Sequence, residues 1–435
     1  MSASTIGLIG IFGLLGLIFL RVPVAIALGM VGFFGYAAID GWKKAGLLLG
    51  SIPFDISTAY SLSVLPLFVL MGEIASAAGM SGRLFAAAKS AAGRMRGSLA
   101  LATIGASAGF GAVCGSSIAT AATMTRIAIP EMRKAGYDDE LSAGAVAAGG
   151  TIGILIPPSL IFVIYALIAQ ESVAKLFAAG LVPGILLTML YGVIALVQIR
   201  MKPSLVPAGD TAEGGERKAR LLGIWEFFLL FGVSVGGIYA GLFTPTEAAA
   251  VGAVTAVGIG MTTGNLGWEA LRGSFAKTIQ TTCMLFMIII CANMFAAFVV
   301  QTHLPEFLLS IVKGRDIPPT LLMILLIVFY IVMGCFLEGL GMILITVPVF
   351  LPLVVQYGFD PLFFGVIVVI VVELGLIHPP VGMNLFVIQA QVPDISIVKI
   401  YKGVFPFLAA PLVLLAILLI FPDIALWLPN LLYGR

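Results

Sequence analysis

Two apolar stretches of the chain contain the same interruption, a glycine followed four residues later by a pair of prolines. The first runs from Gly153 to Ser159 (GILIPPS) and the second from Gly375 to Val381 (GLIHPPV). Proline has no backbone N–H and clashes with the preceding turn, so a Pro pair cannot lie inside a regular helix. The carbonyl groups freed there find no water in a bilayer and need other partners. Broken spans in matching positions of two halves indicate a cation site at each break.

Hydroxyl side chains upstream of the first break could add oxygen ligands for sodium. The segment CGSSIAT begins at Cys114 and contains Ser116 and Ser117, within a region rich in Gly, Ala and Ser. If this segment is the tip of a hairpin that meets the first break, carbonyl and hydroxyl oxygens would surround an ion without adding net charge. The alternative is that these small residues only allow close helix packing.

The region before the second break carries an acidic residue instead. Glu338 lies in the segment FLEGLG, and an uncompensated charge at membrane depth costs about 2.5–3.5 kcal/mol on insertion scales. Glu338 could bind a cation, or it could cap the amides of a helix that returns from the tip. His378 could carry a proton, but its counterpart in the first break is Ile156. That pairing favours a backbone-carbonyl role for the position.

The composition places these breaks in a membrane protein. Of 435 residues, 60% are hydrophobic and only 10% are charged, and the mean hydropathy is +1.15, whereas a soluble domain carries roughly 25% charged residues. We therefore predict an all-α polytopic membrane protein. No basic cluster suggests nucleic acid, and the four cysteines and two histidines show no spacing typical of a disulfide framework or a transition-metal site.

The two halves of the chain resemble each other. A shift of 222 positions places Pro157 on Pro379 (379 − 157 = 222) and brings several other features into register. These are Pro23 with Pro245, Pro130 with Pro352, Gly136-Tyr137-Asp138 with Gly358-Phe359-Asp360, and Gly153 with Gly375. We predict two repeats, 1–200 and 221–435, joined by a polar linker at 201–220. Basic residues around the linker place it in the cytoplasm. The N-terminus would be periplasmic, and the repeats would be inverted.

Each repeat should contain a re-entrant helical hairpin followed by a broken helix. The first hairpin is expected at 97–130, turning at Gly115-Ser116-Ser117, with its broken helix at 138–170. The second is expected at 318–352, turning at Glu338-Gly339-Leu340-Gly341, with its broken helix at 360–392. Amphipathic stretches near 40–60 and 264–280 are candidates for contact with membrane lipid. Further helices are predicted near 5–20, 23–39, 54–79, 174–200, 222–240, 245–263, 274–300 and 398–421.

One of these helices has a recognisable start. Thr244-Pro245-Thr246-Glu247 fits a capping box with proline at the first helical position. A structural role is the simpler interpretation of Glu247.

The motifs GSSIATAAT, GGTIGILIPPS, TPTEAAAVG and ELGLIHPPVGMNLF resemble the large, DctM-like membrane subunit of tripartite ATP-independent periplasmic (TRAP) transporters, and the resemblance covers essentially the whole chain. It implies an elevator-type fold in the bacterial inner membrane. It also implies sodium-coupled import of an organic acid such as a dicarboxylate, keto acid or sialic acid. The expected partners are a small four-helix membrane subunit and a soluble periplasmic binding protein.

The resemblance also implies two sodium sites. Carried onto this chain, the first consists of Cys114, Ser116, Gly153, Ile156 and Pro158. By repeat symmetry the second consists of Phe336, Glu338, Gly375, His378 and Pro380. The substrate would bind between the tips, near Ser117, Ser159 or Asn384. Arg126 could pair with an anionic substrate or with a carboxylate.

Three other functions compete with this interpretation. A stand-alone anion symporter or ion antiporter would share the inverted architecture. An intramembrane enzyme needs a nucleophile paired with a base, or two aspartates at depth, and no serine here has an obvious histidine partner. A purely structural subunit would not require two broken spans. We therefore expect a transporter, not an enzyme.

Overall fold

The computed structural model describes residues 3–93, 95–207, 224–314, 317–334, 337–379 and 381–434, and within these ranges the chain forms helices and no strand. The prediction of an all-α protein is therefore confirmed. Five of the helices are long and apolar enough to cross a membrane, and the bent pair Asp139–Leu155 and Leu160–Ala169 could form a sixth span. Large apolar side chains are exposed over much of the surface, as expected for a protein surrounded by lipid.

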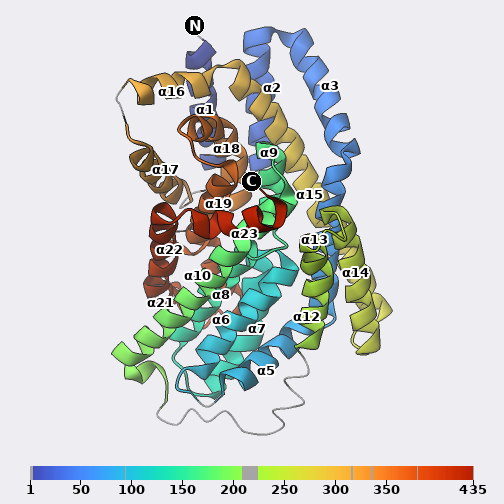
Figure 1. Ribbon diagram of the computed structural model, residues 1–435, viewed down its shortest axis with the longest axis vertical. Helices are drawn as coiled ribbons and strands as arrows, with labels where there is room; N and C mark the ends of the chain where they lie inside the picture. Colours follow the sequence, from blue (N-terminus) through green and yellow to red (C-terminus); the bar gives the residue numbers. More distant parts are fainter. Residues whose placement is uncertain are drawn as a thin grey trace.

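A peripheral group of helices forms one side of the molecule (Figure 1). The long helix α15 packs against α2, α3 and α4, and α14 packs on α4. Their bounds are α2 Val24–Asp40, α3 Trp42–Thr58, α4 Val64–Ala77, α14 Pro245–Thr262 and α15 Trp268–Gln301. Helix α1 (Ala3–Phe19) packs against α2 and α16 (Leu304–Lys313). The short helices α12 (Trp225–Phe231) and α13 (Gly237–Tyr239) are joined by a π-helical turn and lie beside α14.

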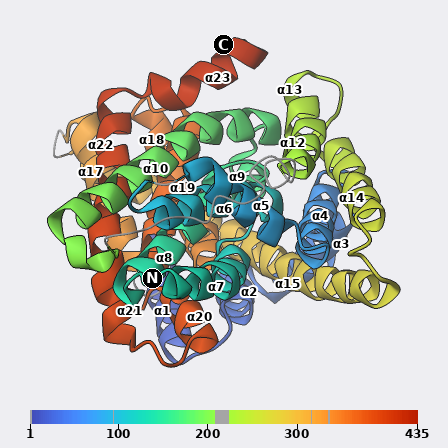
Figure 2. The same ribbon diagram turned by 90° about the horizontal axis from the view of Figure 1, so that it is seen from below.

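A central group contains both proline breaks (Figure 2). In the first half it comprises α5 Met80–Ala92, α6 Ser98–Cys114, α7 Ser117–Lys134, α8 Asp139–Leu155, α9 Leu160–Ala169 and α10 Val173–Met201. In the second half it comprises α17 Pro319–Gly334, α18 Gly339–Gln356, α19 Pro361–Ile377, α20 Met383–Gln391, α21 Ile397–Val404 and α22 Ala409–Ile420. Helices α16 (Leu304–Lys313) and α23 (Asp423–Tyr433) complete the fold. The two halves meet where α8 packs on α19.

The helix boundaries reproduce the internal repeat. Helices α18 and α19 begin at Gly339 and Pro361, each 222 positions after the starts of α7 and α8 at Ser117 and Asp139 (339 − 117 = 361 − 139 = 222). In both halves the first hairpin helix packs against the broken helix through a glycine pair. Gly111 contacts Gly153 in the first half, and Gly334 contacts Gly375 in the second, so closely that a Cβ on any of the four would meet backbone atoms. Close backbone contact of this kind is a common use of glycine in membrane helices.

Several predicted elements differ in detail. The helix expected at 54–79 is divided, because α3 ends at Thr58 and a short 3₁₀ turn, Tyr60–Ser63, precedes α4. The helix expected at 398–421 is similarly divided by the 3₁₀ turn Phe405–Leu408. The amphipathic stretch 264–280 is not a separate element, since Trp268 already begins the 34-residue helix α15.

The second hairpin turns earlier than the sequence suggests. Gly339 and Gly341 belong to the first turn of α18 and not to the connection. Both glycines serve packing, because a Cβ at Gly339 would strike Val372 and one at Gly341 would strike Val24. Residues 208–220 of the predicted linker, together with Phe336 and Pro380, lie outside the described residues.

The capping box at the start of α14 is confirmed. The Thr244 hydroxyl accepts a hydrogen bond from the Glu247 amide at 3.3 Å, and the Glu247 carboxylate accepts one from the Thr244 amide at 2.8 Å. These bonds satisfy two of the amides left free at a helix start.

Candidate functional site

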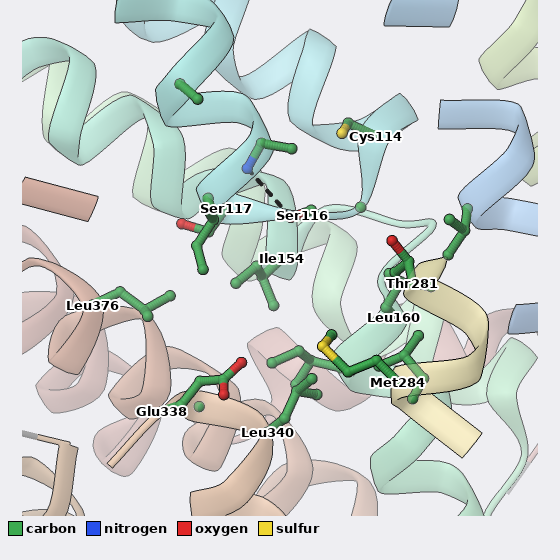
Figure 3. A pocket seen from close by; sticks show the side chains of 18 of the residues that line it. Cys114, Ser116, Ser117, Ile154, Leu160, Thr281, Met284, Glu338, Leu340 and Leu376 are labelled. Atoms are coloured by element: carbon green, nitrogen blue, oxygen red, sulfur yellow. Dashed lines mark hydrogen bonds between the residues drawn. The ribbon is translucent and has the colours of Figure 1, made fainter. Parts of the chain in front are cut away.

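A cavity of about 340 Å³ separates the two hairpin tips (Figure 3). Cys114, Ser116 and Ser117 lie on one side of it, and Glu338 and Leu340 lie on the other. Residues of the first break and of helices α4 and α15 close the remaining walls. These are Ile154, Leu160 and Ile161 from the break region, Val69 and Glu73 from α4, and Thr281, Met284 and Leu285 from α15. The cavity therefore lies between the central and peripheral groups of helices.

The backbone of the first tip is turned by Gly115. This residue has φ +65°, a left-handed conformation that glycine adopts without steric cost, and it ends α6. Ser116 follows in an extended conformation as the N-cap of α7, and its Oγ accepts a hydrogen bond from the amide of Ala119 at 3.4 Å. The tip thus brings hydroxyl groups and the N-terminus of a helix to the cavity wall.

The first tip touches the first break. A Cβ at Gly115 would lie only 2.9 Å from the carbonyl oxygen of Pro158, so no side chain separates the two segments. Helical partners for the carbonyls of Gly153 and Ile154 would be the amides of Pro157 and Pro158, and proline has none. Within the described part of the chain, no other group donates a hydrogen bond to these two carbonyls. The predicted first site is therefore a place where unpaired oxygens and the tip come together.

The second predicted site is only partly described. Glu338 lines the cavity and holds the N-cap position of α18, but its carboxylate accepts no capping hydrogen bond from a backbone amide of that helix. Gly375 packs against Gly334, and His378 ends α19 in an extended conformation. The alternative of Glu338 as a helix-capping carboxylate has no hydrogen bond to support it within residues 337–379.

The four residues considered for substrate contact lie in different environments. Ser117 lines the cavity, and its Oγ accepts a hydrogen bond from Nδ2 of the buried Asn384 at 2.7 Å. Ser159 is buried, and its Oγ caps α9 by accepting the amide of Phe162 at 3.3 Å. Arg126 is exposed on α7 and does not line the cavity. The structure thus joins Ser117 and Asn384 and places Arg126 away from the cavity. Ser159 lies between Pro158, which contacts the first tip, and the wall residue Leu160.

Helices α4 and α15 supply cavity residues that the sequence motifs did not include. Thr281 lies one turn beyond Lys277, whose Nζ is 3.8 Å from the carboxylate of Glu73. The only sequence signal for Thr281 is the polar pair Thr281-Thr282 inside a long apolar helix. Its contribution to the wall results from helix packing that no local pattern reveals.

The electrostatic character of the cavity favours a cation. Two carboxylates line it: Glu73, which has Lys277 at 3.8 Å, and Glu338, which has no ion pair with any described residue. The wall residues themselves include no Lys, Arg or His. Hydroxyl and carbonyl oxygens are the remaining polar groups, and hard cations prefer oxygen ligands. Sodium therefore fits the residues present.

The chain matches the family model described as "Tripartite ATP-independent periplasmic transporter, DctM component" over residues 11–424. The chain belongs to the DctM family. DctM proteins are components of TRAP transporters, so this is a multi-pass membrane transport protein and not an enzyme. The resemblance of the sequence motifs to the large membrane subunit of TRAP transporters is therefore confirmed.

Curated DctM relatives match along nearly the whole chain. The C4-dicarboxylate TRAP transporter large permease protein of Pseudomonas aeruginosa is 36% identical over 385 residues, which are 87% of this chain and 88% of that one. The sialic acid TRAP transporter large permease protein of Vibrio cholerae is 32% identical over 431 residues, 98% of each chain.

Solved structures share the fold of this DctM protein at low sequence identity. The YdaH transporter of Alcanivorax borkumensis superposes with a TM-score of 0.64 at 15% identity, covering 87% of this chain and 88% of that one. MtrF of Neisseria gonorrhoeae gives a TM-score of 0.59 at 14% identity, covering 98% and 95%. At these identities the likeness concerns the fold alone, and it agrees with the all-α architecture described above.

Proposed function

We propose that this DctM protein imports a small organic acid across the bacterial inner membrane, driven by sodium. The observation that carries the proposal is the contact of the first hairpin tip with the first break, where Gly115 lies against the carbonyl of Pro158. Unpaired carbonyls at Gly153 and Ile154 supply oxygens there, and Ser116 supplies a hydroxyl. A sodium ion bound at this point would hold the tip and the break together.

A second sodium ion is proposed at the second tip, with Glu338 as its charged ligand. Glu338 lines the same cavity as Ser116 and Ser117. Two sodium ions taken up with a monoanion would carry one net positive charge inward. That charge is worth about 2.3 kcal/mol per 100 mV, which corresponds to roughly fiftyfold accumulation of substrate.

The substrate acid is proposed to bind between the tips. Helices α7 and α18 both begin at the cavity, and helix N-termini attract carboxylates. The named relatives act on C4-dicarboxylates and sialic acid, so small carboxylates of these classes are the first candidates. A soluble periplasmic binding protein would deliver the acid, and a small membrane subunit would accompany this chain.

Movement of the central helices against the peripheral ones is proposed as the transport step. The cavity lies at the boundary of the two groups, with Glu73 and Thr281 on the peripheral side. An elevator motion would carry both tips and both breaks past α4 and α15. We also propose that the N-terminus is periplasmic and the 201–220 linker cytoplasmic.

Uptake into proteoliposomes tests the proposal. The vesicles would contain this chain and its small subunit, with the cognate binding protein outside and a panel of labelled acids. Uptake should require a sodium gradient, and Ser116→Ala should raise the sodium concentration for half-maximal uptake. Ser90→Ala, on α5 away from the cavity and bonded to the Ala86 carbonyl, is the matched control. Uptake that is equally fast without sodium would contradict sodium coupling.

Dependence on the soluble protein separates the proposal from the alternative of a stand-alone carrier. If uptake proceeds at the same rate without the binding protein, this chain works as an independent symporter or antiporter. Omitting the protein should instead abolish uptake at low substrate concentration.

A further inference from the structure

A second hollow, of about 1020 Å³, lies away from the cavity between the tips. It is a groove between the C-terminal part of α10 and the segment from α21 to α22, which are neighbours in the fold (Figure 1). Lys202 and Lys402 line it, and so do Pro379 and Ala409. None of the residues assigned to uptake above lines this groove. Pro379, which does line it, lies between His378 and Pro380 of the predicted second sodium site.

The walls of the groove are apolar and face outward. Val197, Met201 and Phe405 are among the exposed large hydrophobic residues of the chain. On a membrane protein such side chains contact acyl chains. The groove is therefore open to lipid and chemically suited to a hydrocarbon chain.

The charged side chains that line the groove give it a net positive charge. Lys202 is 3.8 Å from the carboxylate of Glu140, and its side chain remains 65% exposed. Lys402 lies in the last turn of α21 and makes no ion pair with any described residue. Two lysines against one glutamate leave one net positive charge among the residues that line the groove. Basic pockets between membrane helices on the cytoplasmic side are typical binding sites for anionic lipid headgroups.

We propose that this groove binds one anionic phospholipid, with its phosphate at Lys202 and Lys402 and an acyl chain along α10 toward Ala409. The lipid would connect α10 to the segment that follows the second broken helix. The proposal rests on neither sodium coupling nor the identity of the transported acid, so its failure would leave the proposed function intact.

Native mass spectrometry of the full chain, released from detergent, tests the site with two probes. These are phosphatidylglycerol and phosphatidylcholine with identical acyl chains. The wild-type chain should retain phosphatidylglycerol preferentially. The double variant K202Q/K402Q should bind phosphatidylglycerol about tenfold or more weakly, and its binding of phosphatidylcholine should hardly change. R21Q/K134Q removes the same charge from two exposed residues outside the groove and should preserve the preference.

A third variant tests the apolar part of the groove. Ala409→Phe adds bulk at an exposed position, so it should fold, and it should weaken the retention of both lipids. Inorganic phosphate should not displace the lipid. Equal retention of the two lipids by the wild-type chain would overturn the proposal, as would undiminished phosphatidylglycerol binding in K202Q/K402Q. Displacement by free phosphate would show an anion site and not a lipid site.

Discussion

Asn384 donates a hydrogen bond from Nδ2 to Oγ of Ser117 at 2.7 Å, across a sequence separation of 267 residues. The bond ties α20, which follows the second break, to the first turn of α7 at the first tip. Both side chains are buried, and Oδ1 of Asn384 has no partner among the described residues. This hydrogen bond therefore connects the two halves of the chain at the cavity. Oδ1 of Asn384 remains beside it as an acceptor that is unpaired within the described chain.

Removing either partner of this bond should destabilise the protein. Asn384→Ala and Ser117→Ala should each cost about 1–3 kcal/mol, because the remaining buried group loses its partner. The double variant should cost less than the sum of the two, with a coupling energy of about 1 kcal/mol. Unfolding in mixed micelles for all four proteins measures this cycle. Strict additivity would show that the bond contributes nothing.

The glycine pair between α6 and α8 should tolerate no side chain. Gly153→Ala would place a Cβ 2.5 Å from the Cα of Gly111, and overpacking of this kind costs about 1–3 kcal/mol. Gly105→Ala, on the same hairpin helix, meets nothing within 4 Å. The Gly105→Ala substitution lies on α6, the helix of Gly111, and should be neutral or stabilise the protein by up to about 1 kcal/mol through helix propensity. Thermal unfolding of the two variants provides the comparison, and equal effects would argue against a close contact.

Glu338→Gln should weaken the dependence of uptake on sodium. The substitution keeps the shape of the side chain and removes its charge from the cavity. We expect the sodium concentration for half-maximal uptake to rise roughly tenfold, a difference of about 1.4 kcal/mol. Glu269→Gln, on the exposed start of α15, is the control and should behave as the wild type. An unchanged sodium response in Glu338→Gln would remove that carboxylate from the ion site.

The ion pair between Arg83 and Glu226 should matter far more than an exposed pair. Arg83 donates from Nε and Nη2 to one oxygen of Glu226, at 2.9 and 2.7 Å, and the Glu226 side chain is only 4% exposed. Arg83→Ala leaves that carboxylate buried and unpaired, and we expect a loss of about 3–5 kcal/mol in unfolding free energy. Lys44→Ala removes a pair whose lysine is 63% exposed, so its cost should stay below about 1 kcal/mol.

Stability should depend on pH through Asp394, which lies in the loop between α20 and α21. The hydrogen bond from Arg133 lowers the pKa of the Asp394 carboxyl. A lowered folded-state pKa means that the stabilisation is present above the unfolded pKa of about 4 and is lost as pH falls through the folded value. Asp394→Asn should therefore lower the unfolding midpoint at neutral pH, and the difference from wild type should shrink in acid. A difference independent of pH would exclude the carboxylate as its cause.

Some features of this fold follow directly from the sequence because they depend on local backbone chemistry. The prolines at 157 and 158 remove amides from a helix wherever it packs, so the first break was predictable from residue types alone. The repeat offset of 222 residues likewise reappears in the starts of α18 and α19. The capping box at Thr244 is another short-range pattern, and the structure contains it.

Glycine was a less reliable guide, since the same residue serves turns and close packing. Gly115 turns the first tip with a positive φ, whereas Gly339 and Gly341 are helical and make room for Val372 and Val24. Those contacts involve other helices, and no pattern around residue 339 reveals them.

The sequence by itself determined an all-α membrane protein, because its composition fits a protein surrounded by lipid. It also predicted two related halves, each with a hairpin and a proline break, because proline acts through the local backbone. Only the tertiary structure decided that Ser117 meets Asn384, that Glu338 faces the first tip, and that Glu73 and Thr281 complete the wall. These pairings depend on how helices distant in sequence pack and turn about their axes. That arrangement is set by the sum of many apolar contacts, which no single motif encodes.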